Sequence, residues 1–561
     1  MKASDYIVEF LLKQNITDVF GYPGGMVTHL MDSLSRYPVN SHITYNEQGA
    51  AFAACGYAQT TGKVGVAYAT SGPGATNLIT GICNAYFDSI PTVFITGQVN
   101  SFESKGDYHV RQRGFQETDI VSIVTPTTKY AAKIESADRL RWHLEHAFHV
   151  ALEGRKGPVL LDIPMDIMRA QIDPEKLEGY VPEANAYNAD LSVINDLISK
   201  SSHPVILAGS GIKTSGCNRL FNEVYKHLNI PVVTTMLSVD ICKDSYGFIG
   251  AYGSRTANFI VAKSDLVISL GARLDVRQIG ANREAFAPDA KIIRVDIDDG
   301  ELSFKAHEDE IAIRADVKDV LEYLLTVPSF TNDGWIRVCA KIRDELSEID
   351  GRLPNSFVRK ISDFIPKSSI ITTDVGQNQV WVAQSFNVKE DQRIFFSGGH
   401  GAMGYSLPAA IGCSIASGED VYAFMGDGGI QMNIQELQVV AREKLPVKII
   451  LFNNSALGMI RHFQEMYFDD NYTQTIPEGG FTNPDFGAVS KAYGIPYKEV
   501  TKLEDIDGKL FEQGPQFIEV KINEPTYVFP KLEFGKPNQD QEPLLERHLY
   551  DRIMSLDETC L

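Results

Sequence analysis

Short apolar runs that alternate with helical stretches constrain the fold of this 561-residue chain more than any other feature. Near the N-terminus, the spacing of apolar residues predicts a helix from Ala3 to Lys13, and buried strands are predicted within residues 64–74, 90–98 and 157–164. Strands of this kind, separated by helices, are typical of βαβ units, which build parallel sheets with helices on both faces.

The same pattern recurs in two later segments, with strands predicted within residues 203–211, 230–235, 264–273 and 290–298, and then within 369–376, 420–429, 446–454 and 515–523. A polar stretch from Gln171 to Leu191 contains two prolines and indicates an interdomain linker. We therefore predict an α/β protein with three parallel-sheet domains and a C-terminal tail that ends in a helix, divided as residues 1–172, 188–328, 353–525 and 526–561.

Charge and cysteine usage narrow the class of function. A net charge of −20 repels phosphate backbones and anionic membranes, which argues against a nucleic-acid or membrane partner. We find neither a signal peptide at the N-terminus nor an apolar window of about 20 residues that could span a membrane. The seven cysteines show no CxxC spacing, which is typical of buried thiols in a reducing compartment. We predict a cytoplasmic enzyme.

The sharpest functional signal follows two neighbouring strands of the third segment. Gly426-Asp427-Gly428 comes directly after one strand, a helical stretch follows, and Asn453-Asn454 comes directly after the next strand. Because parallel strands end at the same edge of a sheet, these groups are expected to lie close together. A carboxylate and an amide oxygen suit Mg²⁺, and the glycines let backbone amides approach a diphosphate. Either half alone is weak, but the pair at this spacing favours a metal–diphosphate site over a plain loop.

This run resembles the thiamine-diphosphate-binding motif of the superfamily that contains pyruvate decarboxylases and acetolactate synthases. The resemblance implies that Asp427, Asn454 and the backbone carbonyl of Ala456 bind Mg²⁺. It covers roughly residues 1–525. It implies three flavodoxin-like domains, which are a pyrimidine-binding domain, a central domain and a pyrophosphate-binding domain.

A glutamate at the start of an alanine-rich helical stretch carries the second part of the resemblance. From spacing alone, Glu47 is simply a carboxylate at a favourable helix N-terminus. The whole run from Glu47 to Asn77, however, is similar to acetolactate synthases, in which the glutamate holds N1′ of the cofactor's aminopyrimidine. This implies that Glu47 is catalytic, because the bond to N1′ lets the 4′-nitrogen take the proton from C2 of the thiazolium ring.

Further residues match the family around both motifs. The resemblance places a Gly/Pro loop and a Phe–Gln pair beside the reacting centre, which adds Pro23, Gly24, Phe115 and Gln116, although the pair alone is also compatible with a surface loop. It implies cofactor contacts in the third segment from Gly376, Gln377, Asn378, Gly401, Met403, Gly426, Gly428, Gly429, Leu457, Gly458 and Met459. The side chain of Met403 is expected to hold the cofactor in its bent shape, and core packing is the alternative role.

The middle segment resembles the domain in which acetolactate synthases bind FAD without using it for redox chemistry. The resemblance implies contacts with the ADP part of FAD from Gly253, Gly271, Arg273 and Asp296. Glycines at strand ends permit close approach, and arginine pairs well with phosphate. The alternative is a central domain that keeps the fold without a nucleotide, and we favour FAD.

The implied function is a carboligase that decarboxylates pyruvate or a related 2-oxo acid and transfers the acyl-anion equivalent to a second carbonyl compound. The alternatives are a ketosugar or another aldehyde or ketone as acceptor, and a simple 2-oxo acid decarboxylase. A non-catalytic homologue is disfavoured because Glu47, Asp427 and Asn454 are all present.

Three departures from the family bear on the acceptor. Phe463 replaces a tryptophan that is associated with 2-oxobutyrate, Met165 replaces a lysine, and His400 replaces an apolar residue. They leave the acceptor open. The resemblance also implies a homodimer or homotetramer, because in this family the two thiamine-binding domains meet across a subunit interface.

Overall fold

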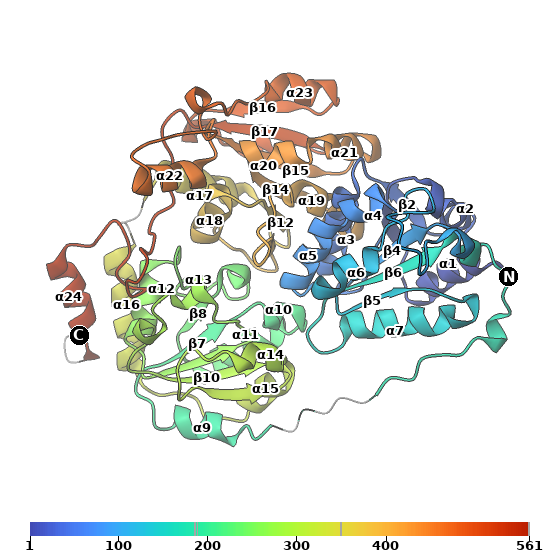
Figure 1. Cartoon of the computed structure of the whole chain (residues 1–561). Coiled ribbons are helices and arrows are strands. Elements are labelled where there is room, and N and C mark those ends of the chain that lie inside the picture. Colours follow the sequence, from blue (N-terminus) through green and yellow to red (C-terminus); the bar gives the residue numbers. More distant parts are fainter. Residues whose placement is uncertain (184–186, 188, 348–350, 559–561) are drawn as a thin grey trace.

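The computed structural model describes residues 1–183, 187, 189–347 and 351–558. Part of the predicted linker, residues 184–186 and 188, and the end of the chain with Cys560 lie outside the described residues. The predicted fold class is confirmed, since the chain forms three sheets in which every strand pair is parallel (Figure 1). In the described part of the chain, no helix is both long and apolar enough to cross a membrane.

The N-terminal domain has a six-stranded sheet in the order β2-β1-β3-β4-β6-β5. Its strands are β1 (Asp18–Gly21), β2 (Asn40–Ile43), β3 (Gly65–Ala69), β4 (Thr92–Gln98), β5 (Tyr130–Lys133) and β6 (Pro158–Pro164). The main helices are α1 (Ala3–Lys13), α2 (Thr28–Leu34), α3 (Glu47–Thr61), α5 (Ile79–Phe87) and α7 (Leu140–Leu152). Strands β3, β4 and β6 are buried along their whole length, as the apolar runs predict.

The central domain has a five-stranded sheet in the order β11-β10-β9-β7-β8, which is the flavodoxin-like order. Its strands are β7 (Pro204–Ala208), β8 (Val232–Thr234), β9 (Leu266–Leu270), β10 (Lys291–Asp296) and β11 (Ile311–Arg314). Its helices include α10 (Gly211–Thr214), α11 (Asn218–Leu228), α12 (Arg255–Ala262), α13 (Val276–Ile279), α15 (Val317–Leu324) and α16 (Asp333–Leu346).

The C-terminal domain repeats the topology of the N-terminal domain, with the order β13-β12-β14-β15-β17-β16. Its strands are β12 (Ile370–Thr373), β13 (Arg393–Phe396), β14 (Val421–Gly426), β15 (Val447–Asn453), β16 (Tyr497–Val500) and β17 (Gln516–Lys521). Its helices include α17 (Leu353–Phe364), α18 (Gln377–Ser385), α19 (Ser406–Ser417), α20 (Asp427–Met432), α21 (Leu437–Glu443), α22 (Gly458–Tyr467) and α23 (Phe486–Ala492).

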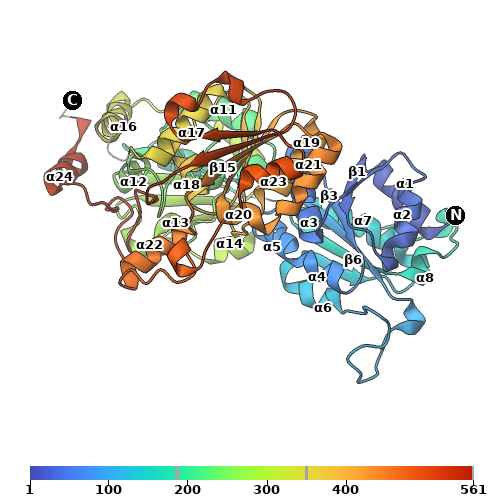
Figure 2. The ribbon, with the colours of Figure 1, turned by 90° about the horizontal axis from the view of Figure 1, so that it is seen from above.

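The two outer domains meet where α3 crosses α19 (Figures 1 and 2). A Cβ atom on Gly56 of α3 would lie 2.1 Å from the carbonyl oxygen of Ala409, and one on Gly412 of α19 would lie 1.9 Å from that of Ala53. Neither position has room for a side chain. The two helices therefore pack backbone against backbone through a reciprocal pair of glycines.

The C-terminal tail leaves β17 and crosses to the central domain, where it ends in α24 (Arg547–Ser555) beside α12 and α16 (Figure 1). The predicted last helix is therefore present. Backbone N–H of Leu532 donates to Ala251 O at 2.7 Å, and Arg255 donates to Gln541 O at 2.9 Å. The tail thus ties the C-terminal domain to the central one.

Candidate functional site

The predicted metal ligand Asp427 lies at the end of β14, where it is the first residue of α20 rather than part of a loop. Its side chain is only 2% exposed. Oδ1 accepts from the Gly428 backbone at 3.0 Å and Oδ2 accepts from Asn483 Nδ2 at 2.6 Å. Burial raises the pKa of Asp427 to about 6. No lysine, arginine or histidine of the described residues pairs with this carboxylate, so the site fits a divalent cation.

The predicted ligand Asn454 follows β15, the neighbour of β14 in the sheet. Its Nδ2 donates to Thr526 Oγ1 at 2.6 Å and to Gln377 Oε1 at 3.1 Å. Among the described residues, the Asn454 Oδ1 atom accepts only from the Ala456 backbone, at 3.3 Å. The side-chain oxygen is thus held at the same sheet edge as Asp427, as the motif predicts.

Two residues that hold the predicted metal ligands in place escaped the sequence analysis. Asn483 donates to Asp427 and also to Asn453 Oδ1 at 3.0 Å, so it bridges the ends of β14 and β15. Thr526, at the start of the tail, donates to Gln377 Oε1 at 2.7 Å while it accepts from Asn454. Both come from irregular segments without a local signal, and only the fold brings them to the site.

Three glycines form a close-fitting cradle at this edge. A Cβ atom on Gly428 would lie 2.5 Å from Leu457 Cδ2 and 3.2 Å from Met403 Cε. One on Gly458 would lie 2.1 Å from Gln377 Oε1, and one on Gly426 would lie 3.3 Å from Asn378 Oδ1. The structure therefore brings most of the cofactor contacts predicted in the C-terminal domain into one place.

The Gly-rich turn that carries Met403 is held by a buried aspartate that the sequence analysis did not single out. Asp374 follows β12 and accepts from the Gly404 backbone at 2.8 Å and from Val375 N at 2.7 Å. Burial raises its pKa to about 7. A Cβ atom on Gly429 would lie 3.0 Å from the carboxyl carbon of Asp374. The segment that carries Asp427 and the turn that carries Met403 therefore pack against the same side chain.

The predicted catalytic glutamate lies at the corresponding edge of the N-terminal sheet. Glu47 is the first residue of α3, which the Asn46 side chain caps, and it is 7% exposed. Its Oε2 accepts from Asn77 Nδ2 at 2.9 Å. Its Oε1 lies 3.1 Å from where a Cβ atom on Gly74 would be, so the Ser-Gly-Pro-Gly turn packs against the carboxylate.

The other residues predicted to lie near the reacting centre surround this turn. A Cβ atom on Gly24 would lie 2.3 Å from Thr70 Cβ, and one on Gly72 would lie 2.9 Å from Gln116 Cβ. Gln116 has a φ of 63°, in the left-handed region that non-glycine residues rarely adopt. Phe115 beside it is 77% exposed.

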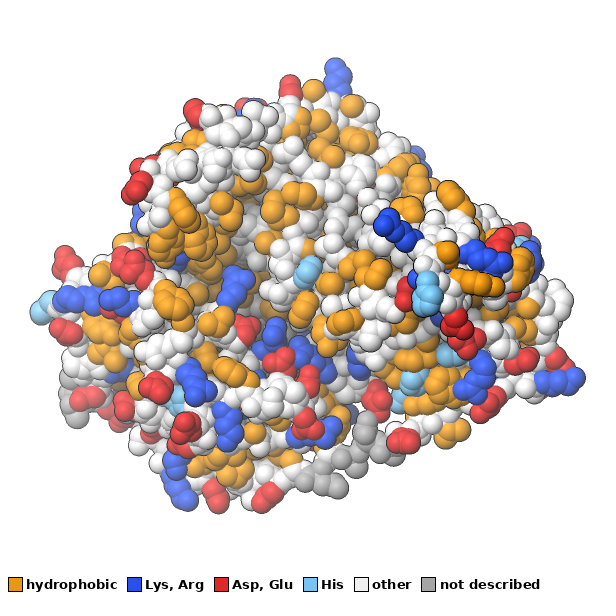
Figure 3. All heavy atoms as spheres, viewed as in Figure 1, with side chains coloured by type: hydrophobic (Ala, Val, Ile, Leu, Met, Phe, Trp, Pro, Cys, Tyr) orange, Lys and Arg blue, Asp and Glu red, His pale blue; other side chains and the backbone are white. Residues whose placement is uncertain are grey.

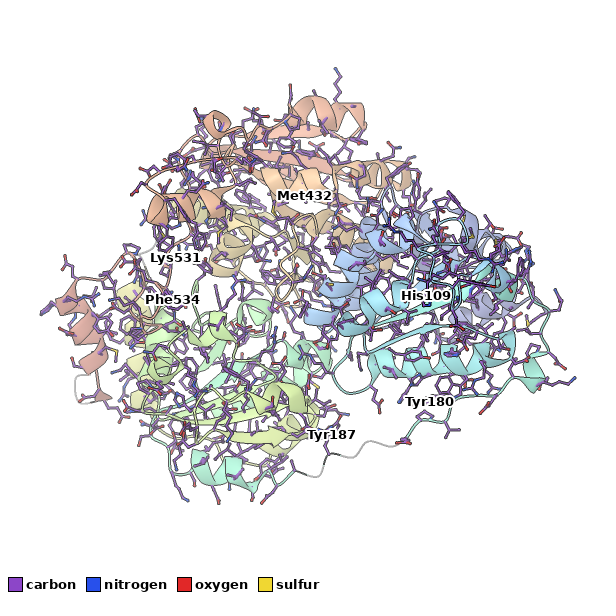
Figure 4. All side chains as sticks on the ribbon, in the orientation of Figure 1. His109, Tyr180, Tyr187, Met432, Lys531 and Phe534 are labelled. Atoms are coloured by element: carbon purple, nitrogen blue, oxygen red, sulfur yellow. The ribbon has the colours of Figure 1, made fainter. Side chains whose placement is uncertain are left out.

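Within one chain, the polar contacts of the described residues do not link the two halves of the predicted site directly. Among the described residues, no hydrogen bond or ion pair links Glu47 to the Asp427 loop. The start of α3 instead contacts the residues that follow α20. Tyr45 N donates to Glu436 Oε1 at 3.0 Å, and Asn433 Nδ2 donates to Gln48 Oε1 at 3.2 Å. Each half lies at a sheet edge with exposed residues nearby, which are Phe115 in the N-terminal domain and Met432 (Figure 4) in the C-terminal domain.

A cavity of about 520 Å³ lies between the three domains, and its lining includes Gly271, Arg273 and Asp296, three of the four predicted FAD contacts. The fourth, Gly253, does not line the cavity; a Cβ atom there would lie 2.4 Å from the backbone oxygen of Phe248, which does. Arg155 of the N-terminal domain, Tyr187 of the linker (Figure 4) and Gly398 of the C-terminal domain also line it.

The comparisons with known proteins follow this division. Residues 1–123, 191–324 and 374–520 match the N-terminal TPP binding domain, the central domain and the C-terminal TPP binding domain of thiamine pyrophosphate enzymes. The acetolactate synthase isozyme 2 large subunit of Escherichia coli (strain K12) is 36% identical over 555 residues, which are 96% of this chain and 99% of that protein.

Relatives in other organisms are equally similar. The acetolactate synthase large subunit of Lactococcus lactis subsp. lactis is 35% identical over 95% of this chain and 94% of its own length. Acetolactate synthase 1, chloroplastic, of Zea mays is 36% identical over 96% of this chain and 88% of its own length. The predicted dependence on thiamine diphosphate is confirmed, and the chain belongs to the acetolactate synthase large-subunit family of thiamine pyrophosphate enzymes.

Proposed function

We propose that this chain is a carboligase that decarboxylates pyruvate or a related 2-oxo acid and joins the remaining acyl unit to a second carbonyl compound. The observation that carries the proposal is the pair of buried acidic groups at matching sheet edges, which are Asp427, without a cationic partner in the described part of the chain, and Glu47 at the start of a helix. Relatives named acetolactate synthase support it. With pyruvate as both donor and acceptor, the product is 2-acetolactate.

In this proposal the C-terminal domain holds the charged end of the cofactor. Asp427, Asn454 and the Ala456 carbonyl would hold Mg²⁺, and the hydrogen bonds from Asn483 to Asp427 and between Asn454 and Thr526 orient the first two side chains. The cradle glycines let backbone amides approach the diphosphate. When bound, thiamine diphosphate supplies the carbon nucleophile and the electron sink for decarboxylation.

Glu47 acts on the pyrimidine end. Its Oε2 is held by Asn77, which fixes the carboxyl group so that Oε1 can share a proton with a ring nitrogen. The turn of Gly74 excludes water from that side of the carboxyl group. Met403, whose Cε lies 3.2 Å from where a Cβ atom on Gly428 would be, is placed to hold the cofactor in its bent shape.

We further propose that the active enzyme is a homodimer or homotetramer in a reducing compartment such as the cytoplasm. The lack of any hydrogen bond or ion pair between Glu47 and the Asp427 loop among the described residues supports assembly, because a second chain can bring the two edges together. The free thiols of the described cysteines support the compartment.

We also propose that the cavity between the domains holds FAD in a structural role. Its volume of about 520 Å³ is in the range of cofactor sites. Gly271, with a φ of 61°, lets the end of β9 approach α10 closely, and Arg155 and Arg273 supply cations.

The test is to incubate the purified protein with thiamine diphosphate, Mg²⁺ and pyruvate, and to follow CO₂ and acetolactate together. Acetolactate at half the pyruvate consumed, lost in Glu47→Gln, is the expected result. Release of CO₂ with acetaldehyde instead would point to a decarboxylase or to a carboligase that uses a different acceptor. Absence of CO₂ with pyruvate and with other 2-oxo acids would refute the proposal.

A further inference from the structure

A buried lysine in the C-terminal tail has an unusual environment. Lys531 is 7% exposed, and its backbone is fixed on both sides, since its N–H donates to Glu542 O at 2.9 Å and its carbonyl accepts from Glu542 N at 2.7 Å. The next residue, Leu532, bonds to Ala251 of the central domain. Figure 4 places Lys531 between α22 and the central domain. The position of its side chain is therefore set by two domains.

The ammonium group of Lys531 faces two side chains of α22 instead of a carboxylate. Nζ lies 4.6 Å from the centroid of the Phe463 ring and 2.8 Å from Met466 Sδ. Among the described residues, no acidic group lies within ion-pair distance of it. Burial lowers the pKa of Lys531, and the charge of Glu533 acts on it only from a distance.

A nearby buried arginine, in contrast to Lys531, has both an acidic partner and an oxygen acceptor. Arg461 pairs with Glu465 at 3.2 Å and donates to Thr526 O at 2.6 Å. Among the described residues, the side chain of Lys531 forms no ion pair with an acidic group and donates no hydrogen bond to an oxygen. A buried cation is costly to leave without an anion, so a ligand anion is the natural partner for this one.

The same helix that Lys531 contacts also forms the cofactor cradle. α22 begins at Gly458, which packs against Gln377, and Phe463 lies about one and a half turns further along. The tail itself starts at the site, because Thr526 bonds to both Asn454 and Gln377. Lys531 is thus tied to the cofactor residues through α22 and through the tail.

The surface beside Lys531 is open and aromatic. Phe463 is 39% exposed, and its ring lies 5.9 Å from that of Tyr467, which is also exposed. Figure 3 shows hydrophobic side chains gathered on this face of the molecule near α22. A molecule that reaches the cofactor along α22 can therefore place an apolar part on Phe463 and an anionic group on Lys531.

We propose that Lys531 determines acceptor specificity by binding an anionic group, a carboxylate or a phosphate, of the acceptor carbonyl compound. This inference rests on the proposed carboligase function and adds the residue that recognises the charge of its second substrate. Phe463 packs against the uncharged part of the acceptor and orients it. Lys531 takes no part in decarboxylation of the donor.

The test compares Lys531→Met and Lys531→Arg with the unmodified full-length enzyme, loaded with thiamine diphosphate and Mg²⁺. Each is supplied with pyruvate as donor and with one of three acceptors, which are pyruvate itself, a nucleoside diphosphate ketosugar, and uncharged acetaldehyde. We expect Lys531→Met to raise KM for an anionic acceptor about 10- to 100-fold, the loss expected for one charge-assisted bond. Lys531→Arg is expected to restore most of that affinity.

The control is Lys536→Met, which removes an exposed lysine from the same tail and is expected to leave every KM unchanged. A rise only with pyruvate as acceptor assigns Lys531 to a carboxylate, and a rise only with the ketosugar nucleotide assigns it to a phosphate. An equal rise with acetaldehyde, or no rise with either anion, would overturn the inference.

Two outcomes separate this inference from the proposed function. If the unmodified enzyme releases no CO₂ from any 2-oxo acid, the carboligase proposal fails and this inference falls with it. If CO₂ is released and products form, but Lys531→Met and Lys531→Arg behave alike with all three acceptors, only the role of Lys531 is refuted. Thermal unfolding of each variant shows whether the tail is still folded.

Discussion

The N-terminal and C-terminal domains have the same strand order but different chemistry at the same place. At the carboxyl ends of its strands, the N-terminal sheet presents Glu47, held by one amide donor from Asn77. The C-terminal sheet presents Asp427 and Asn454, held by Asn483 and Thr526. One scaffold thus carries the carboxyl group that we propose shares a proton in one domain and the metal site that we propose in the other, because function depends on the side chains at the sheet edge.

The largest expected effect separates these two roles. Glu47→Gln should lower turnover about 10²- to 10⁴-fold, as expected for loss of an acid–base group, and should leave binding of thiamine diphosphate and Mg²⁺ within a few-fold. Asp427→Asn should do the reverse and weaken Mg²⁺-dependent cofactor binding first. Calorimetric titration together with steady-state kinetics measures both. Equal loss of cofactor binding in the two variants would contradict the assignment of catalysis to Glu47 and of metal binding to Asp427.

The contact between the two domains can be broken at the helix crossing. Gly412→Ala places a methyl group 1.9 Å from the Ala53 carbonyl oxygen, where only backbone movement can relieve the clash. We expect a loss of stability of about 3 kcal/mol, at the upper end for overpacking. Urea denaturation measures it. Gly508→Ala, which adds a methyl group with no neighbour within 4 Å, is the matched control and should unfold as the unmodified protein does.

The supporting residues sharpen the comparison further. Asn483→Ala removes the bond to Asp427 and the bridge between β14 and β15, and should weaken Mg²⁺-dependent cofactor binding about 10- to 100-fold. Asn77→Ala should instead lower turnover and leave metal binding unchanged, because its partner is Glu47. Titration with Mg²⁺ at fixed cofactor distinguishes them. A loss of metal affinity in Asn77→Ala would show that the two edges are not independent.

The smallest effect concerns a second contact between the domains. The His42 ring lies between Asp18 and Glu443, with Nε2 2.9 Å from Asp18 Oδ1 and Nδ1 2.9 Å from Glu443 Oε2. Desolvation opposes the charged ring, but the bonds to both carboxylates outweigh it and raise the pKa to about 9. Arg442 also donates to Glu443, to Oε1 at 2.8 Å, so this carboxylate faces a second cation.

Because this pKa is higher in the folded protein than in the unfolded chain, the histidine stabilises the fold below pH about 6.5, and the contribution is lost as the pH rises through about 9. We expect His42→Gln to cost about 1 to 2 kcal/mol at pH 6 and much less at pH 10. Thermal unfolding from pH 6 to 10 checks this. A difference in Tm that does not change with pH would show that the ring is uncharged.

The sequence analysis found the long buried strands and missed the short ones at or near sheet edges. β4 and β6 have seven residues each and are buried throughout, so apolar runs reveal them. β2 and β16 have four residues each and are largely exposed or half-buried, so neither composition nor alternation marks them. Such strands form because a neighbouring strand is already in place, which is a tertiary effect.

The candidate site shows the same limit. Asp427, Asn454 and Glu47 stand beside strands or helix starts that have strong local signals. Asn483 and Thr526 lie in irregular segments 56 and 72 residues from the groups that they hold. Lys531 shows no local pattern either, and its burial without an acidic partner is visible only in the folded chain.

The cavity between the domains has walls from all three domains and from the linker, so it exists only after those segments have met. Any molecule that fills it binds the assembled chain and not the unfolded one. By mass action, a ligand present at 100 times its Kd stabilises that assembled state by about 2.7 kcal/mol, whatever chemistry it can perform. An occupant of this cavity therefore acts as a folding effector: scarcity of the molecule would shorten the lifetime of the protein before it slowed any catalytic step.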